Sequence, residues 1–416
     1  MFKLYHRSQY LCVLLCIVSL TATLILTPTF HQKTIASTRT HSAAELRGVW
    51  LTNIDSDVLF ESDRLKNAIQ RLHQLNFNTI YPTVWNWGYT LYPSRVAQRV
   101  IGRSLDPTPG LQRRDVLNEI VQQAHRKGMA AIPWFEFGFM APADSLLAQR
   151  HPQWLTSRRD GSKIWQEGTH ERVWLNPFRP DVQQFILDLI VEIVGNYDVD
   201  GIQFDDHFGL PSEFGYDAYT VALYQKEHQG QSPPSDPQDA EWVRWRADKI
   251  TNYMQRVFHT IKARKQNCLI SVSPNPQRVS YDLFLADWEK WERKGFIEEL
   301  ILQVYRNDIN VFISELQYPE VVAAQRHIPV GVGILSGLKN RHVPIKQVQE
   351  QVAEVRQRKF AGVSFFFYET LWNLSQEKSS DRQSVFQRLF SAATPRPNIY
   401  KGRGVLAQRD EVRSEG

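Results

Sequence analysis

Short apolar runs alternate with stretches of helical period along most of the chain. Eight such runs occur, at 46–53, 78–86, 129–137, 199–205, 269–275, 300–306, 328–334 and 361–369. Several of them are almost continuously apolar, which is typical of strands covered on both faces. The intervals predict helices at 63–75, 114–128, 179–197, 239–264, 312–326 and 345–358.

Eight strands alternating with helices predict an α/β fold, a closed parallel (β/α)8 TIM barrel built as one large domain. The rival architecture is an open doubly wound sheet, but no glycine-rich GxGxxG turn supports it. Two connections, 88–112 and 207–238, are too long for plain linkers. Both follow the carboxyl end of a predicted strand, so we expect them on the catalytic face of the barrel.

The first 43 residues have the order of an export signal. Lys3 and Arg7 precede the apolar run 11–26, and a polar stretch rich in Ser and Thr follows it. We therefore expect residues 1–43 to be a signal peptide, or a membrane anchor through 11–26 if they are not cleaved. The protein would then be exported, either secreted or periplasmic, or attached to the membrane by this segment.

Charge gives no reason to expect nucleic acid as a partner. The formal net charge is +5, but four of the basic residues and no acidic one lie in residues 1–43. The rest of the chain holds 45 basic against 44 acidic side chains, so the basic excess belongs mainly to the predicted signal. In that nearly neutral part we expect the barrel over 44–394 and a polar tail over 395–416.

Chemistry that needs a metal, a cofactor or a reactive thiol lacks its motifs. The sequence has no HExxH, no paired CxxC, no phosphate-binding glycine loop and no GxSxG elbow. Three consecutive residues such as Asp205, Asp206 and His207 rarely converge on one ion, so we expect neither metal nor cofactor. Cys268 is the single cysteine after residue 43, and its apolar surroundings suit a small buried side chain.

Carboxylates at predicted strand ends are the catalytic candidates. In "VDGIQFDDHFG" (199–209), the strand alternation turns Gln203 and Asp205 towards the barrel axis and leaves Asp206 at the rim, in support. Glu136 ends the third run among aromatic residues, a setting that raises a carboxyl pKa as a general acid requires. Glu369 ends the eighth run. The alternatives are a helix cap or loop ion pair for the two aspartates, and a salt-bridged core acid for Glu136.

Aromatic and polar side chains near the same strand ends are the candidates for substrate binding. Aromatic rings stack on the apolar faces of sugars, and amides and carboxylates bind the hydroxyl groups. Any one of these rings could instead fill the core, and Asn176, ahead of Pro177, could hold substrate or cap a helix. The full set is Trp50, Trp85, Trp87, Trp134, Asn176, Gln203, Tyr305, Asp308, Tyr368 and Trp372.

Several of these blocks resemble a known family. "ELRGVWLTN", "NFNTIYPTVWN", "AHRKGMAAIPWFEF", "WLNPFRPDVQQFIL", "VDGIQFDDHFG" and "LILQVYR" occur in the order found in glycosyl-hydrolase-like family 10, also known as domain of unknown function 187. The resemblance spans roughly residues 45–375. It implies a glycosidase-type barrel, export, and action on polysaccharide, which for some members is the glycan of the bacterial cell wall.

The resemblance also assigns residues. It implies that Asp205 and Asp206 are the family's acidic pair and that Asn176 matches its asparagine-proline. The chain departs from the family at the third strand, where "PWFEFGFM" stands in place of an Ala-Trp followed by a polar turn. Whether Glu136 is a general family acid or a feature of a subgroup stays open at this point.

The sequence thus predicts an exported glycoside hydrolase acting on polysaccharide, with peptidoglycan glycan strands as a candidate substrate. Asp205 would be the nucleophile or base, with Glu136 as the acid and Asp206 in support. The alternative is a non-catalytic glycan-binding barrel protein of the cell envelope, because a fold does not guarantee an activity.

Overall fold

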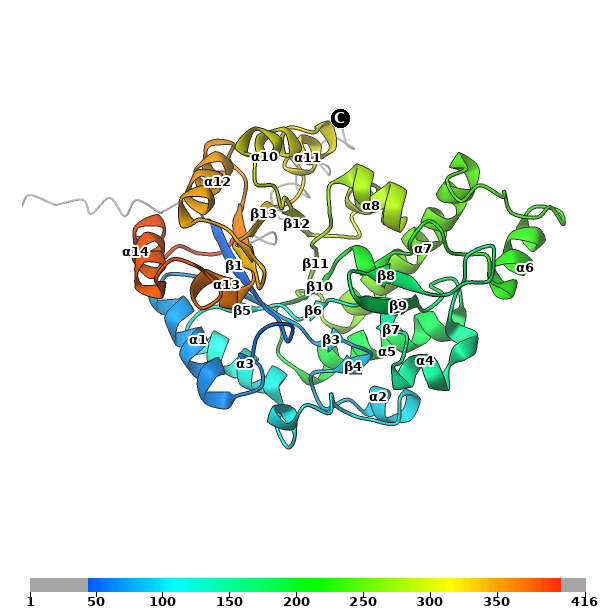
Figure 1. The fold of residues 1–416 in the computed structure, drawn as a ribbon, viewed down its shortest axis with the longest axis horizontal. Coiled ribbons are helices and arrows are strands. Elements are labelled where there is room, and N and C mark those ends of the chain that lie inside the picture. The colour runs from blue at the N-terminus through cyan, green and yellow to red at the C-terminus, as the bar shows by residue number, and fades with distance from the viewer. Residues whose placement is uncertain (1–43, 398–416) are drawn as a thin grey trace, which may run out of the picture. The chain divides into compact units, whose positions relative to one another are not determined.

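The centre of the computed structural model, which describes residues 44–397, is a ring of parallel strands surrounded by helices (Figure 1). The hydrogen-bonded order is β5-β2-β1-β16-β13-β12-β11-β10-β6. The strands are β1 (Leu46–Leu51), β2 (Thr79–Pro82), β5 (Ala130–Ala131), β6 (Trp134–Phe135), β10 (Gly201–Phe204), β11 (Leu269–Val272), β12 (Glu299–Gln303), β13 (Val330–Leu335) and β16 (Gly362–Phe366). Each of the eight predicted runs overlaps one of these strands, and the third overlaps two.

The ring closes because β5 and β6, the first and last strands in this order, are two halves of one interrupted strand. β5 pairs with β2, whereas β6, which follows after Ile132 and Pro133, pairs with β10. Ile132 donates its N–H to the oxygen of Ile80 at 2.9 Å, and the oxygen of Pro133 accepts from the N–H of Gln203 at 2.8 Å. Pro133 has no N–H of its own, which explains the break. The predicted TIM barrel is confirmed.

Alternate side chains of each strand face the barrel axis and the helices. On β1, Leu46 and Trp50 belong to the cluster that fills the barrel, whereas Val49 and Leu51 pack in the larger core outside it. Gly48 lies between the two inward residues, and a Cβ at this position would come within 2.8 Å of the Ser364 side chain. Because the axis is filled, the strand ends remain as the place for a site.

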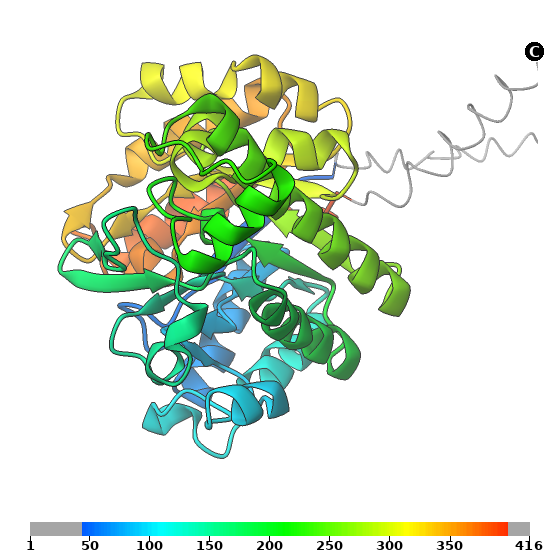
Figure 2. The ribbon, with the colours of Figure 1, turned by 90° about the vertical axis from the view of Figure 1, so that its right-hand side faces the viewer.

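Helices cover the outside of the ring, as the view turned by 90° also shows (Figure 2). They are α1 (Ser62–Gln74), α3 (Val116–His125), α5 (Pro180–Asn196), α7 (Ala240–Arg264), α9 (Trp288–Arg293), α10 (Ile309–Leu316), α11 (Pro319–Ala324), α12 (Ile345–Gln357) and α14 (Ser379–Leu389). The prediction of one helix over 312–326 was wrong. The structure has two helices in this range. Pro319 has no N–H to continue α10, and it is the first residue of α11.

The connections at the carboxyl ends of the strands carry further elements. Residues 88–112 and 207–238 occupy this side, as predicted, but the sequence pattern did not predict the insertion between β6 and α5. That insertion contains a three-stranded antiparallel sheet in the order β7-β9-β8. The added elements are β3 (Trp85–Asn86), β4 (Tyr89–Thr90), α2 (Arg95–Val100), β7 (Met140–Pro142), α4 (Leu146–Arg150), β8 (Trp165–Glu167), β9 (His170–Trp174), α6 (Ala218–Glu227), α8 (Gln277–Phe284), β14 (Gly337–Leu338), β15 (Arg341–His342) and α13 (Tyr368–Trp372).

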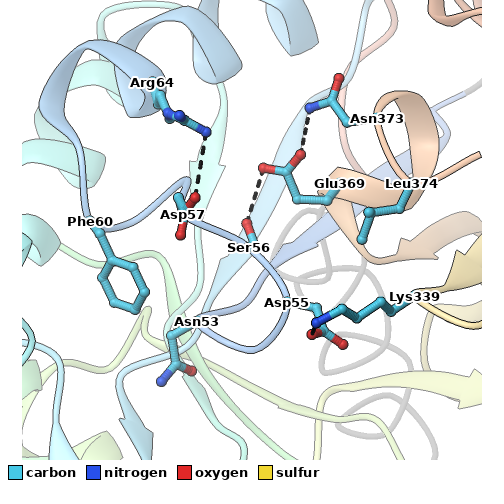
Figure 3. A pocket seen from close by; sticks show the side chains of 10 residues that line it. All are labelled: Asn53, Asp55, Ser56, Asp57, Phe60, Arg64, Lys339, Glu369, Asn373 and Leu374. Carbon is cyan, nitrogen blue, oxygen red and sulfur yellow. Dashed lines mark hydrogen bonds and ion pairs between the residues drawn. The ribbon is translucent and has the colours of Figure 1, made fainter.

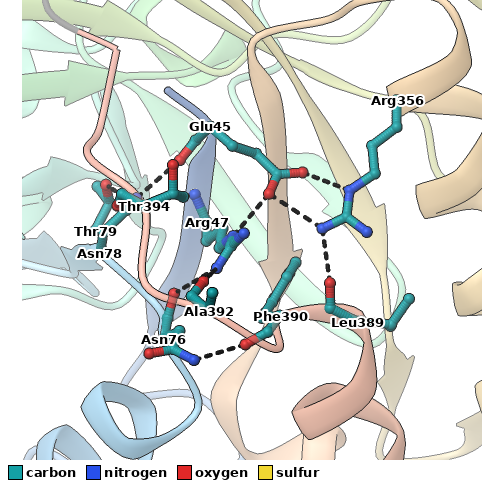
Figure 4. A network of polar contacts seen from close by, with 10 residues as sticks. All are labelled: Glu45, Arg47, Asn76, Asn78, Thr79, Arg356, Leu389, Phe390, Ala392 and Thr394. Carbon is teal, nitrogen blue, oxygen red and sulfur yellow. Dashed lines mark hydrogen bonds and ion pairs between the residues drawn. The ribbon is translucent and has the colours of Figure 1, made fainter. Parts of the chain in front are cut away.

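At the opposite, amino end of the strands, the start of the barrel is tied to its last helices (Figure 4). The Glu45 carboxylate accepts hydrogen bonds from Arg47 Nε at 2.7 Å and from Arg356 Nε at 2.6 Å. The two guanidinium groups also donate to main-chain oxygens, Arg47 to Ala392 at 2.7 Å and Arg356 to Leu389 at 2.8 Å. One carboxylate therefore joins β1, α12 and the segment that follows α14.

Two predicted segments fall wholly or largely outside the described residues 44–397. They are the signal or anchor over 1–43, with its apolar run 11–26, and most of the predicted tail. Within the described range, no helix is long and apolar enough to cross a membrane. The tail begins in close contact with the barrel, because Arg396 forms an ion pair with Glu299 at the amino end of β12.

Candidate active site

Asp205 lies directly after β10, with its carboxylate turned towards the barrel axis as the strand alternation predicted. Its neighbour two residues earlier, Gln203, is fully buried between Trp50 Nε1 at 2.7 Å and Ser271 Oγ at 3.0 Å. The Asp205 carboxylate accepts hydrogen bonds from Trp134 Nε1 at 3.2 Å and from the N–H of His207 at 2.9 Å. It is 5% exposed, so two donors fix its direction in a largely dry setting.

Asp206 turns away from the axis and connects β10 to the segment after β11. Its Oδ2 accepts from the N–H and the side-chain amide of Asn275, at 2.8 and 2.6 Å, and its Oδ1 accepts from Ser280 Oγ at 2.5 Å. Burial raises the pKa of Asp206, although these three bonds oppose the shift. Both of its oxygens are occupied by protein donors, which suits a positioning role.

Glu136 follows β6 and supplies the second carboxyl group near the axis. Its Oε2 accepts from Thr83 Oγ1 at 3.0 Å and from Asn86 Nδ2 at 2.6 Å, whereas its Oε1 has no hydrogen-bond partner within the described chain. Burial raises the pKa of Glu136 to about 7; the bond from Thr83 lowers it, and the charge of Asp205 raises it. A carboxyl group that titrates near neutral pH can donate a proton at working pH.

His207 joins the ends of the two strands. Its Nδ1 lies 2.7 Å from the main-chain oxygen of Glu136 and 3.2 Å from Asp205 Oδ1. A carbonyl oxygen only accepts, so Nδ1 carries the hydrogen. Burial lowers the pKa of His207, but the charge and hydrogen bond of Asp205 outweigh it and raise the pKa to about 9. The imidazolium is therefore a cation placed beside both candidate catalytic groups.

These groups share one cavity of about 230 Å³ at the carboxyl ends of the strands. Of the residues predicted from sequence, it brings together Glu136, Asp205, Asp206, Trp134 and Tyr305. The sequence did not predict six others that line it: Glu167, His207, Asn275, Phe284, Gln303 and Phe366.

Some of these unpredicted residues carried a usable signal in the sequence. Gln303 is two positions before Tyr305 at the end of β12, so strand alternation would have placed both towards the axis. His207 adjoins the aspartate pair. Glu167 had no such signal, because it reaches the cavity from the antiparallel insertion, far along the chain from the end of any barrel strand.

Glu369, the fourth catalytic candidate, lies in a different pocket of about 520 Å³ (Figure 3). Its Oε1 accepts from Ser56 Oγ at 3.1 Å and its Oε2 from Asn373 Nδ2 at 2.6 Å. Figure 3 shows this carboxylate, which α13 carries, between Ser56 of the segment after β1 and Asn373, the residue that directly follows α13. The structure therefore does not bring Glu369 together with Asp205.

The predicted aromatic set divides by position. Trp134 and Tyr305 line the cavity, and Trp50 forms part of the barrel filling beneath it. Trp87 lines a separate pocket with Arg172, beside the antiparallel insertion. The other three rings are buried in the outer core and line none of these pockets: Trp85, Tyr368 and Trp372.

Two polar candidates have structural contacts. Asn176 is buried and donates its amide to Asp217 and Thr220, at 2.9 and 2.8 Å, so it fixes the start of helix α6. Asp308 caps helix α10 by accepting from the N–H groups of Asn310 and Val311. Neither lines the catalytic cavity. Within residues 44–397, no group of three His, Cys, Asp or Glu side chains could hold a metal ion.

Comparison with known proteins places this chain in a family. A family model described as Glycosyl hydrolase-like 10 matches residues 45–354. Glycosyl hydrolase DigH of Escherichia coli (strain K12) is 25% identical over 323 residues, which are 68% of this chain and 70% of that protein.

Two solved structures share the fold at low identity. The PgaB (BpsB) glycoside hydrolase domain of Bordetella bronchiseptica has a TM-score of 0.61 at 14% identity, covering 85% of this chain and 99% of that one. The catalytic domain of a Paenibacillus polymyxa β-amylase has a TM-score of 0.57 at 10% identity, covering 85% and 100%. The expected glycosidase-type barrel and glycoside hydrolase class are confirmed at this level, and the chain belongs to the glycosyl hydrolase-like 10 family.

Proposed function

We propose that the protein cleaves polysaccharide with Asp205 and Glu136 as its reacting pair. One observation carries this assignment: a carboxyl group with a pKa of about 7 and a hydrogen-bonded aspartate line the same small cavity, at the ends of the neighbouring strands β6 and β10. Glycoside hydrolysis needs such a division between a proton donor and an ionised carboxylate.

The chemistry follows from the two environments. Glu136 gives its proton to the glycosidic oxygen as the bond from that oxygen to the anomeric carbon breaks, and the leaving sugar departs as an alcohol. Asp205 either attacks the anomeric carbon, forming an ester that water later hydrolyses, or takes a proton from the attacking water. In the first route, the water that hydrolyses the ester gives its proton to Glu136. In the second route, Asp205 releases the proton it took to solvent and Glu136 takes one from solvent, so the acid is regenerated in both.

Substrate and location are parts of the same proposal. The family resemblance favours glycan strands of bacterial peptidoglycan as the polysaccharide. Export is supported by the basic, apolar and polar order of residues 1–43, with 11–26 as the anchor if that segment is retained. Asp206 supports the pair by holding the segment after β11 in place.

The deciding experiment is turnover by the purified protein on a panel of glycans, each also tested with Asp205→Asn. The panel contains peptide-free peptidoglycan strands, chitin oligomers, and α- and β-glucans. Cleavage that disappears in the variant supports the proposal. Equal product from both proteins would remove Asp205 from the mechanism. Binding of a glycan without any cleavage would instead favour the glycan-binding alternative.

A further inference from the structure

The antiparallel insertion presents one face of a hairpin to the catalytic cavity. β8 and β9 are joined by the two-residue turn Gly168–Thr169, in which Gly168 has φ +58°. Directly paired residues of antiparallel strands have side chains on the same face. Trp165, whose partner is Arg172, contacts the rings of Trp174 and Phe284, and Phe284 lines the cavity.

Glu167 is on this same face, at the tip of the hairpin, and is one of the residues that line the cavity. Its Oε2 accepts from Arg172 Nε at 2.8 Å, across the hairpin. The Arg172 side chain is only 3% exposed, and its guanidinium lies 4.6 Å from the Trp87 ring centre and 5.1 Å from that of Phe137. The position of Glu167 is therefore fixed through an arginine that is itself held by two rings.

The geometry points to Glu167 as a substrate-binding carboxylate, which accepts hydrogen bonds from hydroxyl groups of the glycan in the catalytic cavity. This inference rests on the proposed function and gives a role to the fourth carboxyl side chain that lines the cavity, beside those of Glu136, Asp205 and Asp206. One oxygen is engaged by Arg172, and the other, Oε1, has no hydrogen-bond partner within residues 44–397. Sugar hydroxyl groups are donors that a carboxylate with a free oxygen binds well.

Glu167 and Glu136 have opposite settings, and this separates their roles. Glu136 is buried among aromatic residues without a cationic side chain bonded to its carboxyl, whereas Glu167 is half exposed and bonded to a guanidinium. A carboxylate oriented by an arginine, with one oxygen left without a partner, is placed to accept hydrogen bonds from sugar hydroxyl groups. Glu167 therefore binds substrate, and the proton is donated by Glu136.

The test compares Glu167→Gln with Glu171→Gln, measuring kcat, KM and the pH profile on peptide-free peptidoglycan strands and on chitin hexamer. Glu171 is the matched control, because it is an exposed glutamate of the same hairpin on the opposite face. We expect E167Q to raise KM by about 10- to 100-fold with kcat within about threefold, as loss of a charged hydrogen bond predicts. E171Q should match the wild type within about twofold.

Three results would overturn the inference. E167Q kinetics equal to the wild type would remove Glu167 from binding. A drop in turnover by a factor of about 100 or more, with loss of the alkaline limb of the pH profile, would make Glu167 the acid. A KM change in E171Q as large as in E167Q would show a general effect on the hairpin. If the wild type cleaves neither glycan, the glycan affinities of D205N and D205N/E167Q are compared instead. Equal affinities of the two variants would reject the substrate-binding role of Glu167, and so would the absence of any binding.

Discussion

His207 donates its Nδ1 hydrogen to the main-chain oxygen of Glu136 at 2.7 Å, so one imidazole joins the carboxyl ends of β6 and β10. The same nitrogen lies 3.2 Å from Asp205 Oδ1. The two proposed reacting groups are therefore positioned from a common point. Because β6 and β10 are neighbours in the ring, this one side chain contacts both strand ends.

The proton donor can be tested through the alkaline limb of the pH–rate profile. With a pKa of about 7, Glu136 loses its proton above neutrality, so we expect activity to fall there. Glu136→Gln should lower kcat by about 10²- to 10⁴-fold and remove this limb. Thr83→Val deletes a hydrogen bond that lowers the pKa of Glu136, so it should move the limb to higher pH. If T83V leaves the alkaline limb in place or moves it to lower pH, the limb belongs to a group other than Glu136.

The same carboxyl group should make folding stability depend on pH. Its pKa is raised from 4.5 to about 7 in the folded state, so its contribution favours folding below pH 4.5 and is lost as pH rises to 7. E136Q lacks this titration. Between pH 4 and pH 8 we expect the variant to gain up to about 3 kcal/mol relative to the wild type, measured by urea unfolding. An equal difference at both pH values would contradict the raised pKa.

The two adjacent aspartates should respond differently to the same substitution. In D206N, the new side-chain oxygen can still accept from Asn275, and Ser280 can donate to the Asn275 oxygen at 2.9 Å instead. We expect D206N to keep activity within about tenfold, whereas D205N should lose about 10³-fold or more, as nucleophile or base removal does. Steady-state kinetics on the glycan found in the panel checks this. Equal losses in both variants would show that Asp206 also touches substrate.

Glu369 offers a test of the separate pocket. Its carboxylate bonds Ser56 and Asn373 and lines none of the catalytic cavity. We expect Glu369→Gln to leave kcat within about threefold of the wild type and the pH profile unchanged. A loss of turnover comparable to that of E136Q would return Glu369 to the reaction.

The junction at the amino end of the barrel should be sensitive to acid. Burial by itself raises the pKa of Glu45, but the hydrogen bonds from Arg356 and Arg47 outweigh burial and lower this pKa. Its contribution is therefore present above pH 4.5 and is lost as pH falls through the lower folded pKa. Glu45→Gln should cost about 1–3 kcal/mol at pH 7 and less at about pH 3, by urea unfolding. Glu61→Gln is the control, since Glu61 forms an exposed pair with Arg64, and its loss should leave the free energy of unfolding close to that of the wild type.

The local pattern of apolar and polar residues was sufficient to predict the barrel. Parallel strands buried on both faces appear in the sequence as apolar runs, and the helices between them show the helical period of apolar positions. The side-chain directions on β10 could also be predicted, since strand alternation placed Gln203 and Asp205 towards the axis. The helix break at Pro319 required only local chemistry that the sequence contains, yet the apolar period on both sides of it obscured the break.

By itself, the sequence determined the eight strands, the order of helices, the side to which Asp205 points and the place of Glu136 at a strand end, because these depend on periods of a few residues. Only the tertiary structure decided which strand-end residues meet. Glu369 and Asp308 carry the same local signal as Glu136 but are bonded elsewhere, and Glu167 enters the cavity from an insertion with no strand-end signal at all. The physical reason is that a cavity is lined by side chains from segments far apart in the sequence. Closure of the barrel and packing of its loops bring these segments together, and no short sequence period encodes either.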